Sequence, residues 1–170
     1  MIWMTLIGLG LVAGIVIHND DDDSSDGTDT PPVDQETDES TNGSDLLLGT
    51  SGADSINGLG GDDTVTGEKG DDRLFGDSGN DSLDGGVDDD LVNGGSGNDD
   101  LDGGEDNDQV YGKDGNDRAS GGDGDDSVYG GEGNDTVLGR DGDDFLRGGG
   151  GEDRVFGDEG NDTLKGDGGN

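Results

Sequence analysis

The chain has 170 residues, of which 45 are Asp or Glu, 40 are Gly and only 8 are Lys or Arg, so its formal net charge is −37. A chain this acidic repels nucleic acid and anionic lipid headgroups, and we expect it to bind neither. It has no cysteine, which excludes disulfides and zinc–thiolate sites, and its lone histidine, His18, has no second histidine with which to hold zinc.

An almost unbroken apolar run occupies residues 1–17. Seventeen residues are at the short limit for a membrane-spanning helix. The run lacks the basic residues of a typical signal peptide, although Leu11-Val12-Ala13 is a passable cleavage site. We expect residues 1–18 to form an apolar helix that serves as a membrane anchor or as a cleaved signal. Both alternatives place the acidic remainder outside the cytoplasm, in an extracellular or cell-surface location where Ca²⁺ is plentiful.

Residues 19–42 are acidic and polar. The segment opens after Asn19 with four consecutive aspartates and contains both prolines of the chain, Pro31 and Pro32. Like charges along such a segment repel one another, and few apolar residues are available for burial. We therefore expect a disordered, extended linker.

A nine-residue repeat fills the region 43–170. Glycine recurs every nine residues from Gly49 to Gly157, which defines thirteen complete units over 49–165 and a partial one after them. Counted from that glycine, position four is Gly except for Asp88 and Asp106, and position eight is always apolar. An imperfect unit precedes the array, and we interpret it as a cap. A register kept over so many units indicates a repeat architecture.

Position six of the unit is Asp in every complete repeat, which makes these residues the candidate metal ligands. They are Asp54, Asp63, Asp72, Asp81, Asp90, Asp99, Asp108, Asp117, Asp126, Asp135, Asp144, Asp153 and Asp162.

Each unit reads as a six-residue turn followed by a three-residue strand. Glycine suits turns that need positive φ, and Asp is among the few other residues that tolerate that region, so we expect positive φ at Asp88 and Asp106. Side chains alternate across a strand, so position eight should point inward while positions seven and nine point to solvent. The latter two positions hold the basic residues Arg73, Arg118, Arg147, Arg154 and Lys165.

Hydrophobic burial alone is too weak to fold this array. One Val or Leu per unit contributes about 1.5–3 kcal/mol, whereas ordering each residue costs about 1 kcal/mol or more. The stacked aspartates also repel one another. A hard divalent cation between turns would offset both effects, and carboxylate and carbonyl oxygens are the ligands that Ca²⁺ prefers.

The sequences at residues 94–102 and 130–138, GGSGNDDLD and GGEGNDTVL, resemble the RTX (repeats-in-toxin) calcium-binding nonapeptide. The resemblance extends over residues 43–170 and implies an all-β fold, a right-handed parallel β-roll with two nonapeptides per turn. It further implies Ca²⁺ ions between units n and n+2, bound by the position-six aspartates and by carbonyls of the glycine turns. Thirteen units would hold about eleven ions, which would reduce the formal charge from −37 to about −15.

A non-catalytic, secreted or cell-surface calcium-binding module with a structural or adhesin-like role is the function that we predict. We do not expect an enzyme, because no unique acid, base or nucleophile interrupts the repeat. The alternatives are an ice-binding face, a carbohydrate- or partner-binding strip formed by Tyr111, Tyr129 and Phe75, and a fragment of a larger RTX enzyme or toxin. A solvent-facing cross-strand ladder is the simpler interpretation of the aromatic residues.

One interior layer is predicted to be weak. Ala119 is the only position-eight residue smaller than Val, and two nonapeptides per turn would place Leu101 and Val137 beside it. The same spacing predicts that Asp100 and Arg118 are neighbours on the outer surface.

Overall fold

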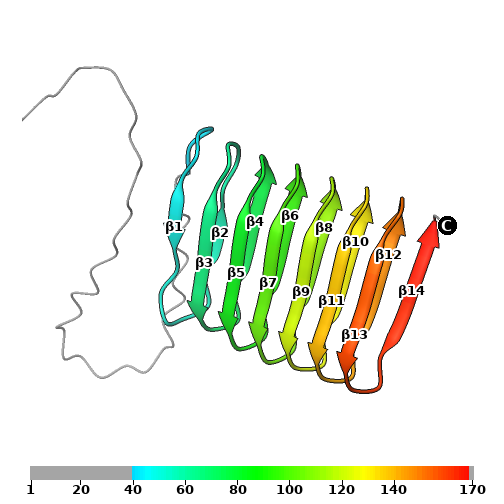
Figure 1. Cartoon of the computed structure of the whole chain (residues 1–170). Helices are drawn as coiled ribbons and strands as arrows, with labels where there is room; N and C mark the ends of the chain where they lie inside the picture. Colours follow the sequence, from blue (N-terminus) through cyan, green and yellow to red (C-terminus); the bar gives the residue numbers. More distant parts are fainter. Residues whose placement is uncertain (1–39, 169–170) are drawn as a thin grey trace, which may run out of the picture.

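The computed structural model describes residues 40–168. The helix predicted within residues 1–18, and most of the linker predicted for 19–42, lie outside the described residues. The described chain forms two facing sheets of parallel strands, and it crosses from one sheet to the other at every nonapeptide (Figure 1). The prediction of an all-β parallel roll is confirmed.

Fourteen strands alternate between the two sheets, which we call the odd sheet and the even sheet after the numbers of their strands. The odd sheet comprises β1 (Leu46–Leu48), β3 (Thr64–Lys69), β5 (Ser82–Val87), β7 (Asp100–Glu105), β9 (Arg118–Asp123), β11 (Thr136–Asp141) and β13 (Arg154–Glu159). The even sheet comprises β2 (Ser55–Asn57), β4 (Arg73–Ser78), β6 (Leu91–Ser96), β8 (Gln109–Asp114), β10 (Ser127–Glu132), β12 (Phe145–Gly150) and β14 (Thr163–Gly168).

Paired strands are offset by eighteen residues, so one turn of the roll contains two nonapeptides, as predicted. Asp100 is the register partner of Arg118, and Ala119 lies between Leu101 and Val137. Both expected sets of neighbours are therefore confirmed. Because every pair keeps the same offset, residues at one position of the repeat form a straight column along the roll axis.

The strands are longer than the sequence suggested. From β3 onward each has six residues, because positions one to three of the following unit continue the pairing that positions seven to nine begin. Only positions four to six remain as a turn. The prediction of six-residue turns was therefore wrong, and the reason is that residues with positive φ at position two, such as Glu68 at 80° and Arg140 at 91°, interrupt the strand without ending it.

Position eight forms the core, as predicted. Twelve residues from Leu47 to Leu146 are at most 3% exposed and form one continuous apolar column between the sheets. Val155 packs partly against this column, and Leu164 in the last strand is 47% exposed. The basic residues at positions seven and nine lie on the outside. Residues 40–168 contain no helix that is long and apolar enough to cross a membrane.

Candidate metal centre

The position-six aspartates point between the two sheets and form two columns, one along each row of turns. From Asp63 to Asp144 they are at most 3% exposed, although each carries a carboxylate. The backbone N–H of each aspartate donates a hydrogen bond to Oδ1 of the aspartate one turn later. In the run from Asp45 to Asp144, these N···O distances are 2.7–3.1 Å.

The second oxygen of these carboxylates has no partner. Oδ2 is buried without a hydrogen bond in eleven aspartates. They are Asp63, Asp72, Asp81, Asp90, Asp99, Asp108, Asp117, Asp126, Asp135, Asp144 and Asp153. A buried carboxylate oxygen without a donor is costly, so each of these atoms calls for a cation or a proton.

Each unpartnered oxygen faces the glycine at position one of its own unit. A Cβ atom placed on Gly130 would lie 2.5 Å from Asp135 Oδ2 and 2.6 Å from the carbonyl oxygen of Gly148, one turn later. The two oxygens therefore lie within about 5 Å of each other, beside a hollow that only glycine leaves open. A carboxylate oxygen and a carbonyl oxygen that converge in this way are a donor set for a hard cation.

The same burial perturbs the protonation of the carboxylates. Burial raises the pKa of Asp108 to about 8 and the pKa of Asp72 and Asp117 to about 7. It raises the pKa of Asp90 and Asp126 to about 6. The backbone N–H that each carboxylate accepts opposes this shift, and neighbouring carboxylates add to it. Without a cation, the folded roll therefore favours the protonated form of these groups.

The first two units satisfy their aspartates in a different way. Asp54 Oδ2 accepts hydrogen bonds from the backbone N–H of Thr50 at 2.6 Å and from its hydroxyl at 3.1 Å. In the preceding unit, Thr41 donates the equivalent pair to Asp45 Oδ2, both at 2.8 Å. Threonine at position two thus provides the partners that the interior carboxylates lack, which the sequence analysis did not foresee.

Position five adds a ladder of amide side chains that the sequence analysis also missed. Along one row of turns, Asn98 donates its backbone N–H and its side-chain Nδ2 to Asn80 Oδ1, at 2.9 and 3.1 Å. Asn116 and Asn134 repeat the arrangement on the next two turns. The recurrence of Asn-Asp every eighteen residues from Asn80 to Asn134 was the signal that could have revealed it. These bonds join successive turns without a cation.

Side-chain carboxylates alone do not form a complete metal site. Among residues 40–168, no three His, Cys, Asp or Glu side chains converge on one point. Any ion in the turns would thus take at most two carboxylates and complete its six to eight ligands with backbone carbonyls. The donor set, made only of oxygens, fits Ca²⁺ and excludes metals that need nitrogen or sulfur ligands.

The outer face of the even sheet carries an aromatic ladder. The rings of Tyr111 and Tyr129 stack with centroids 4.9 Å apart, and Phe145 lies 5.9 Å beyond Tyr129. The ammonium groups of Lys113 and Lys165 cover the outer ends of this stack, over Tyr111 and Phe145 respectively. The expected cross-strand ladder is therefore present for Tyr111 and Tyr129, whereas Asn93 separates Phe75 from it.

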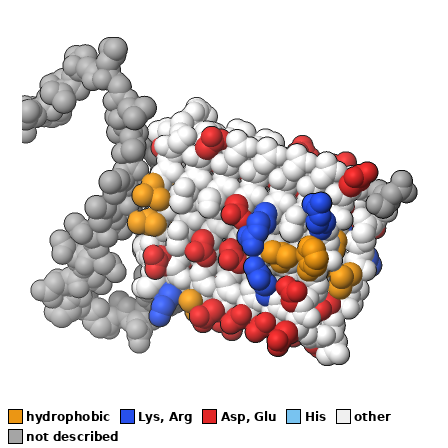
Figure 2. Space-filling model, viewed as in Figure 1, with side chains coloured by type: hydrophobic (Ala, Val, Ile, Leu, Met, Phe, Trp, Pro, Cys, Tyr) orange, Lys and Arg blue, Asp and Glu red, His pale blue; other side chains and the backbone are white. Residues whose placement is uncertain are grey.

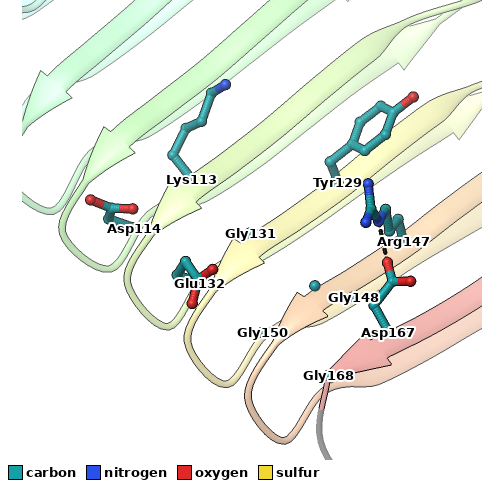
Figure 3. A pocket seen from close by; sticks show the side chains of 11 residues that line it. Lys113, Asp114, Tyr129, Gly131, Glu132, Arg147, Gly148, Gly150, Asp167 and Gly168 are labelled. Atoms are coloured by element: carbon teal, nitrogen blue, oxygen red, sulfur yellow. Dashed lines mark hydrogen bonds and ion pairs between the residues drawn. The ribbon is translucent and has the colours of Figure 1, made fainter.

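A trough of about 560 Å³ runs beside this ladder. Its floor consists of glycines on β10 and β12, and Figure 3 shows Arg147 between Tyr129 and Asp167, with which it forms an ion pair. Lys113 and Glu132 lie on neighbouring strands at the other end. The trough therefore combines an aromatic ring, cations, carboxylates and a flat backbone floor.

Comparison with known families gives a match that covers most of the chain. The sequence matches the family described as RTX calcium-binding nonapeptide repeat (4 copies), in overlapping segments at residues 39–74, 66–101, 75–110, 102–137, 111–146 and 138–170. No curated protein matches the chain.

Proposed function

Because this chain belongs to the RTX calcium-binding nonapeptide repeat family, we propose that its repeat region is a non-catalytic module whose folding depends on Ca²⁺. The observation that carries this proposal is the set of eleven buried carboxylate oxygens without a partner. Their number equals the number of n/n+2 pairs in thirteen repeats. When bound, Ca²⁺ would supply the positive charge that these oxygens lack.

The chain's own residues have three roles in this proposal. Eleven of the position-six aspartates provide one free carboxylate oxygen each, and the N–H bonds to Oδ1 hold these carboxylates in a fixed orientation. The position-one glycines, such as Gly130, leave the space into which oxygens from two turns converge. Asp54 and Asp162 are the two ends of one column and would each contribute to a single ion. Asp54 is the less dependent on it because Thr50 already binds its Oδ2.

A calcium titration followed by circular dichroism tests this function. We expect little β-structure in EDTA and a cooperative gain of β-structure with Ca²⁺, with a midpoint of about 10⁻⁴–10⁻³ M, the range of extracellular modules. Isothermal titration calorimetry of the same chain should give about eleven ions. Spectra that overlay in EDTA and in excess Ca²⁺ would refute the proposal.

The location that we propose is the cell surface or the extracellular medium. The high negative charge and the expected affinity of about 10⁻⁴–10⁻³ M both suit a compartment rich in Ca²⁺. Whether residues 1–17 anchor the chain or are removed is decided by the N-terminal sequence of the mature protein. Loss of the apolar run would favour the signal, and its retention in a membrane fraction would favour the anchor.

A carbohydrate-binding strip is a second candidate function, favoured by the trough beside Tyr129. Its glycine floor could pack against a sugar ring, while Arg147 and Glu132 offer a donor and an acceptor to hydroxyl groups. The test is binding of neutral oligosaccharides by the Ca²⁺-loaded chain. Tyr129→Ala should weaken binding at least tenfold, and Phe75→Ala, on the same sheet but away from the trough, should not. Equal effects would exclude this function.

A further inference from the structure

The basic side chains of the roll lie almost entirely on the flat outer faces of its sheets and not in its turns. All eight Lys and Arg residues lie in the repeat region, and all except Lys69 occupy position two, seven or nine on the outer face of a sheet. We define the odd face as the side chains at positions two, seven and nine on the seven strands of the odd sheet. It carries five acidic and three basic residues, so its net charge is −2 on a chain of −37. A face this close to neutral does not repel a second acidic molecule strongly.

Apolar, acidic and basic side chains follow one another in a definite order on the odd face, from the N-terminal to the C-terminal end of the roll. Leu46 and Leu48, 40% and 42% exposed, lie on β1, and Phe156, 46% exposed, lies on β13. Between these apolar ends, Glu68 and Asp84 occupy the N-terminal half. Figure 2 shows this order of apolar, acidic, basic and again apolar side chains from the N-terminal end of the roll.

The basic residues of this face lie in its C-terminal half. Arg118, Arg140 and Arg154 are on β9, β11 and β13. Strand β7 lies at the centre, with three odd strands on either side. When the order of the strands is reversed, the acidic N-terminal half therefore lies over the basic C-terminal half, and the apolar ends lie over each other.

Two copies of the roll can face each other through their odd faces, related by a two-fold axis parallel to the strands. Such an axis lies between two facing copies, reverses the order of the strands and keeps each position of the repeat opposite itself. It places Glu68 opposite Arg140, both at position two. It also places Leu48 opposite Phe156, both at position nine. The two-fold symmetry makes each of these contacts occur twice in the dimer.

At the centre of this arrangement, Asp100 and Asp102 on β7 each face their own counterpart in the other copy. Asp100 forms an ion pair with Arg118 of the same copy at 3.1 Å. Burial raises the pKa of Asp102, which favours its protonated form and weakens the repulsion there. The even face lacks the same symmetry, because reversal would place Lys165 opposite Asn57 and Arg147 opposite Phe75. The even face therefore lacks the opposite charges and the paired apolar ends that the odd face brings together, although Leu46 on the odd face lies opposite Arg154.

The area of the odd face suits a specific but modest interface. Seven strands at a spacing of about 4.8 Å and six residues of about 3.3 Å each give roughly 600 Å² per copy. Two copies would bury about 1,200 Å² in total, which is at the lower limit for specific protein–protein interfaces.

We propose that the odd face binds a second copy of this chain, face to face, in a two-fold dimer with β1 of one copy over β13 of the other. The face exists only in the folded roll, so this inference rests on the proposed function and the dimer should form only with Ca²⁺.

Cysteine cross-linking of the full chain tests the geometry, because the chain has no cysteine of its own. Leu48 and Phe156 lie six strand spacings apart within one copy, about 29 Å, too far for an internal disulfide. Under mild oxidation in Ca²⁺, the double variant Leu48→Cys/Phe156→Cys should form a covalent dimer.

The matched control is Asn57→Cys/Lys165→Cys, with the same positions and spacing on the even face. Cross-linking by random collision would appear equally in both variants and would refute the proposal, as would an absence of cross-linking in the first. Circular dichroism of the same samples separates the two claims. A chain that stays unfolded in Ca²⁺ contradicts the proposed function and the dimer, whereas a folded monomer contradicts the dimer alone.

Charge exchange tests the pairing of Glu68 with Arg140. Both residues already adopt positive φ, so exchanging them adds no new backbone strain. In analytical ultracentrifugation with Ca²⁺, Glu68→Arg and Arg140→Glu should each raise the dimer dissociation constant by about tenfold or more. The double exchange should restore it. Single variants that dimerise like the wild type, or a double variant that stays monomeric, would refute this pairing.

Discussion

The first two units of the roll and the interior units share one repeat, but they satisfy the inward carboxylate oxygen differently. In the first two, Thr41 and Thr50 donate hydrogen bonds to the inward carboxylate oxygen. In the interior turns the position-two residue adopts positive φ and the carboxylate oxygen has no partner. The difference indicates that the fold itself does not require a cation at every aspartate. The requirement arises where the threonine cap is replaced by a tighter, more symmetrical turn.

Glycine substitution at position four should show the largest contrast between the two regions. A Cβ on Gly115 would clash with the carbonyl oxygen of Gly97, and Gly115 has a φ of 143°. A Cβ on Gly52, in the second unit, would meet no atom within 4 Å. Gly115→Ala should therefore destabilise the Ca²⁺-loaded roll by about 3 kcal/mol or more, whereas Gly52→Ala should change its stability by less than about 1 kcal/mol.

The measurement is thermal unfolding in excess Ca²⁺, followed by circular dichroism. Gly52→Ala is the matched control, because it makes the same change at the same position of the repeat. Similar losses of melting temperature in the two variants would show that the first turns are as tightly packed as the interior.

Removal of single aspartates should give the next largest contrast. Asp99→Ala or Asp117→Ala removes an acceptor from a buried backbone N–H and one oxygen from a proposed ion site. We expect a cost of about 2–3 kcal/mol and a clear rise in the Ca²⁺ midpoint. Asp54→Ala removes a carboxylate that Thr50 already satisfies, at the end of a near one-dimensional stack, and should cost less. Equal shifts of the midpoint in all three variants would contradict the distinction between capped and uncapped turns.

The sequence predicted the repeat, the register and the core because each depends on side-chain type at a fixed spacing. Position eight is apolar in every unit, and positive φ at Asp88 and Asp106, 83° and 78°, follows from their place in a glycine position. The parts that were missed depend on backbone conformation. Lys113 and Arg140 at position two give no sequence signal for positive φ, yet this conformation extends the strands to six residues.

The sequence identified the candidate aspartates but not the hydrogen bonds that their carboxylate oxygens accept. The thirteen aspartates were evident from their period alone. Sequence could not show that one carboxylate oxygen is bound by an N–H of the previous turn while the other is free, because both atoms belong to the same side chain. It also could not show that Asp54 Oδ2 accepts hydrogen bonds from the backbone N–H and the hydroxyl of the residue at position two, Thr50, while Asp63 Oδ2 has no partner.

Acidification without Ca²⁺ should mimic part of the effect of the ion in the interior turns. Burial raises the folded-state pKa of Asp108 to about 8 and that of Asp72 to about 7, well above the value of about 4 in an unfolded chain. Because the folded-state pKa is the higher one, protonation stabilises the folded roll. This stabilisation is complete below about pH 4 and is lost as the pH rises through about 6 to 8. In EDTA, β-structure should therefore increase as the pH is lowered from 8 to 4.

A neutral substitution separates this effect from general charge reduction. Asp108→Asn retains the acceptor for the Asp90 N–H and replaces the unpartnered oxygen with a donor beside the Gly121 carbonyl. It should raise the β-structure of the chain in EDTA at pH 8, whereas Asp54→Asn, which disrupts the Thr50 cap, should not. A decrease of β-structure on acidification in EDTA would show that the buried carboxylates do not limit folding.

The smallest expected effect concerns the core, which both regions share and which should not distinguish them. Ala119 is fully buried between Leu101 and Val137, so the apolar column is narrowest there. The neighbouring pair of Arg118 and Asp100 is exposed and offers only about 0–1 kcal/mol, too little to replace a branched side chain. Ala119→Val should add apolar contact worth about 1 kcal/mol, raise the melting temperature with Ca²⁺ and lower the Ca²⁺ midpoint. It should leave the number of bound ions unchanged in calorimetry, because the oxygens of the turns are not altered. At limiting Ca²⁺, protease cleavage of the wild type should begin near residues 112–120 and should be slower in the variant. A neutral or destabilising Ala119→Val would mean that the column is already filled at this level, and that the sheets approach each other more closely there than at Val110 or Val128.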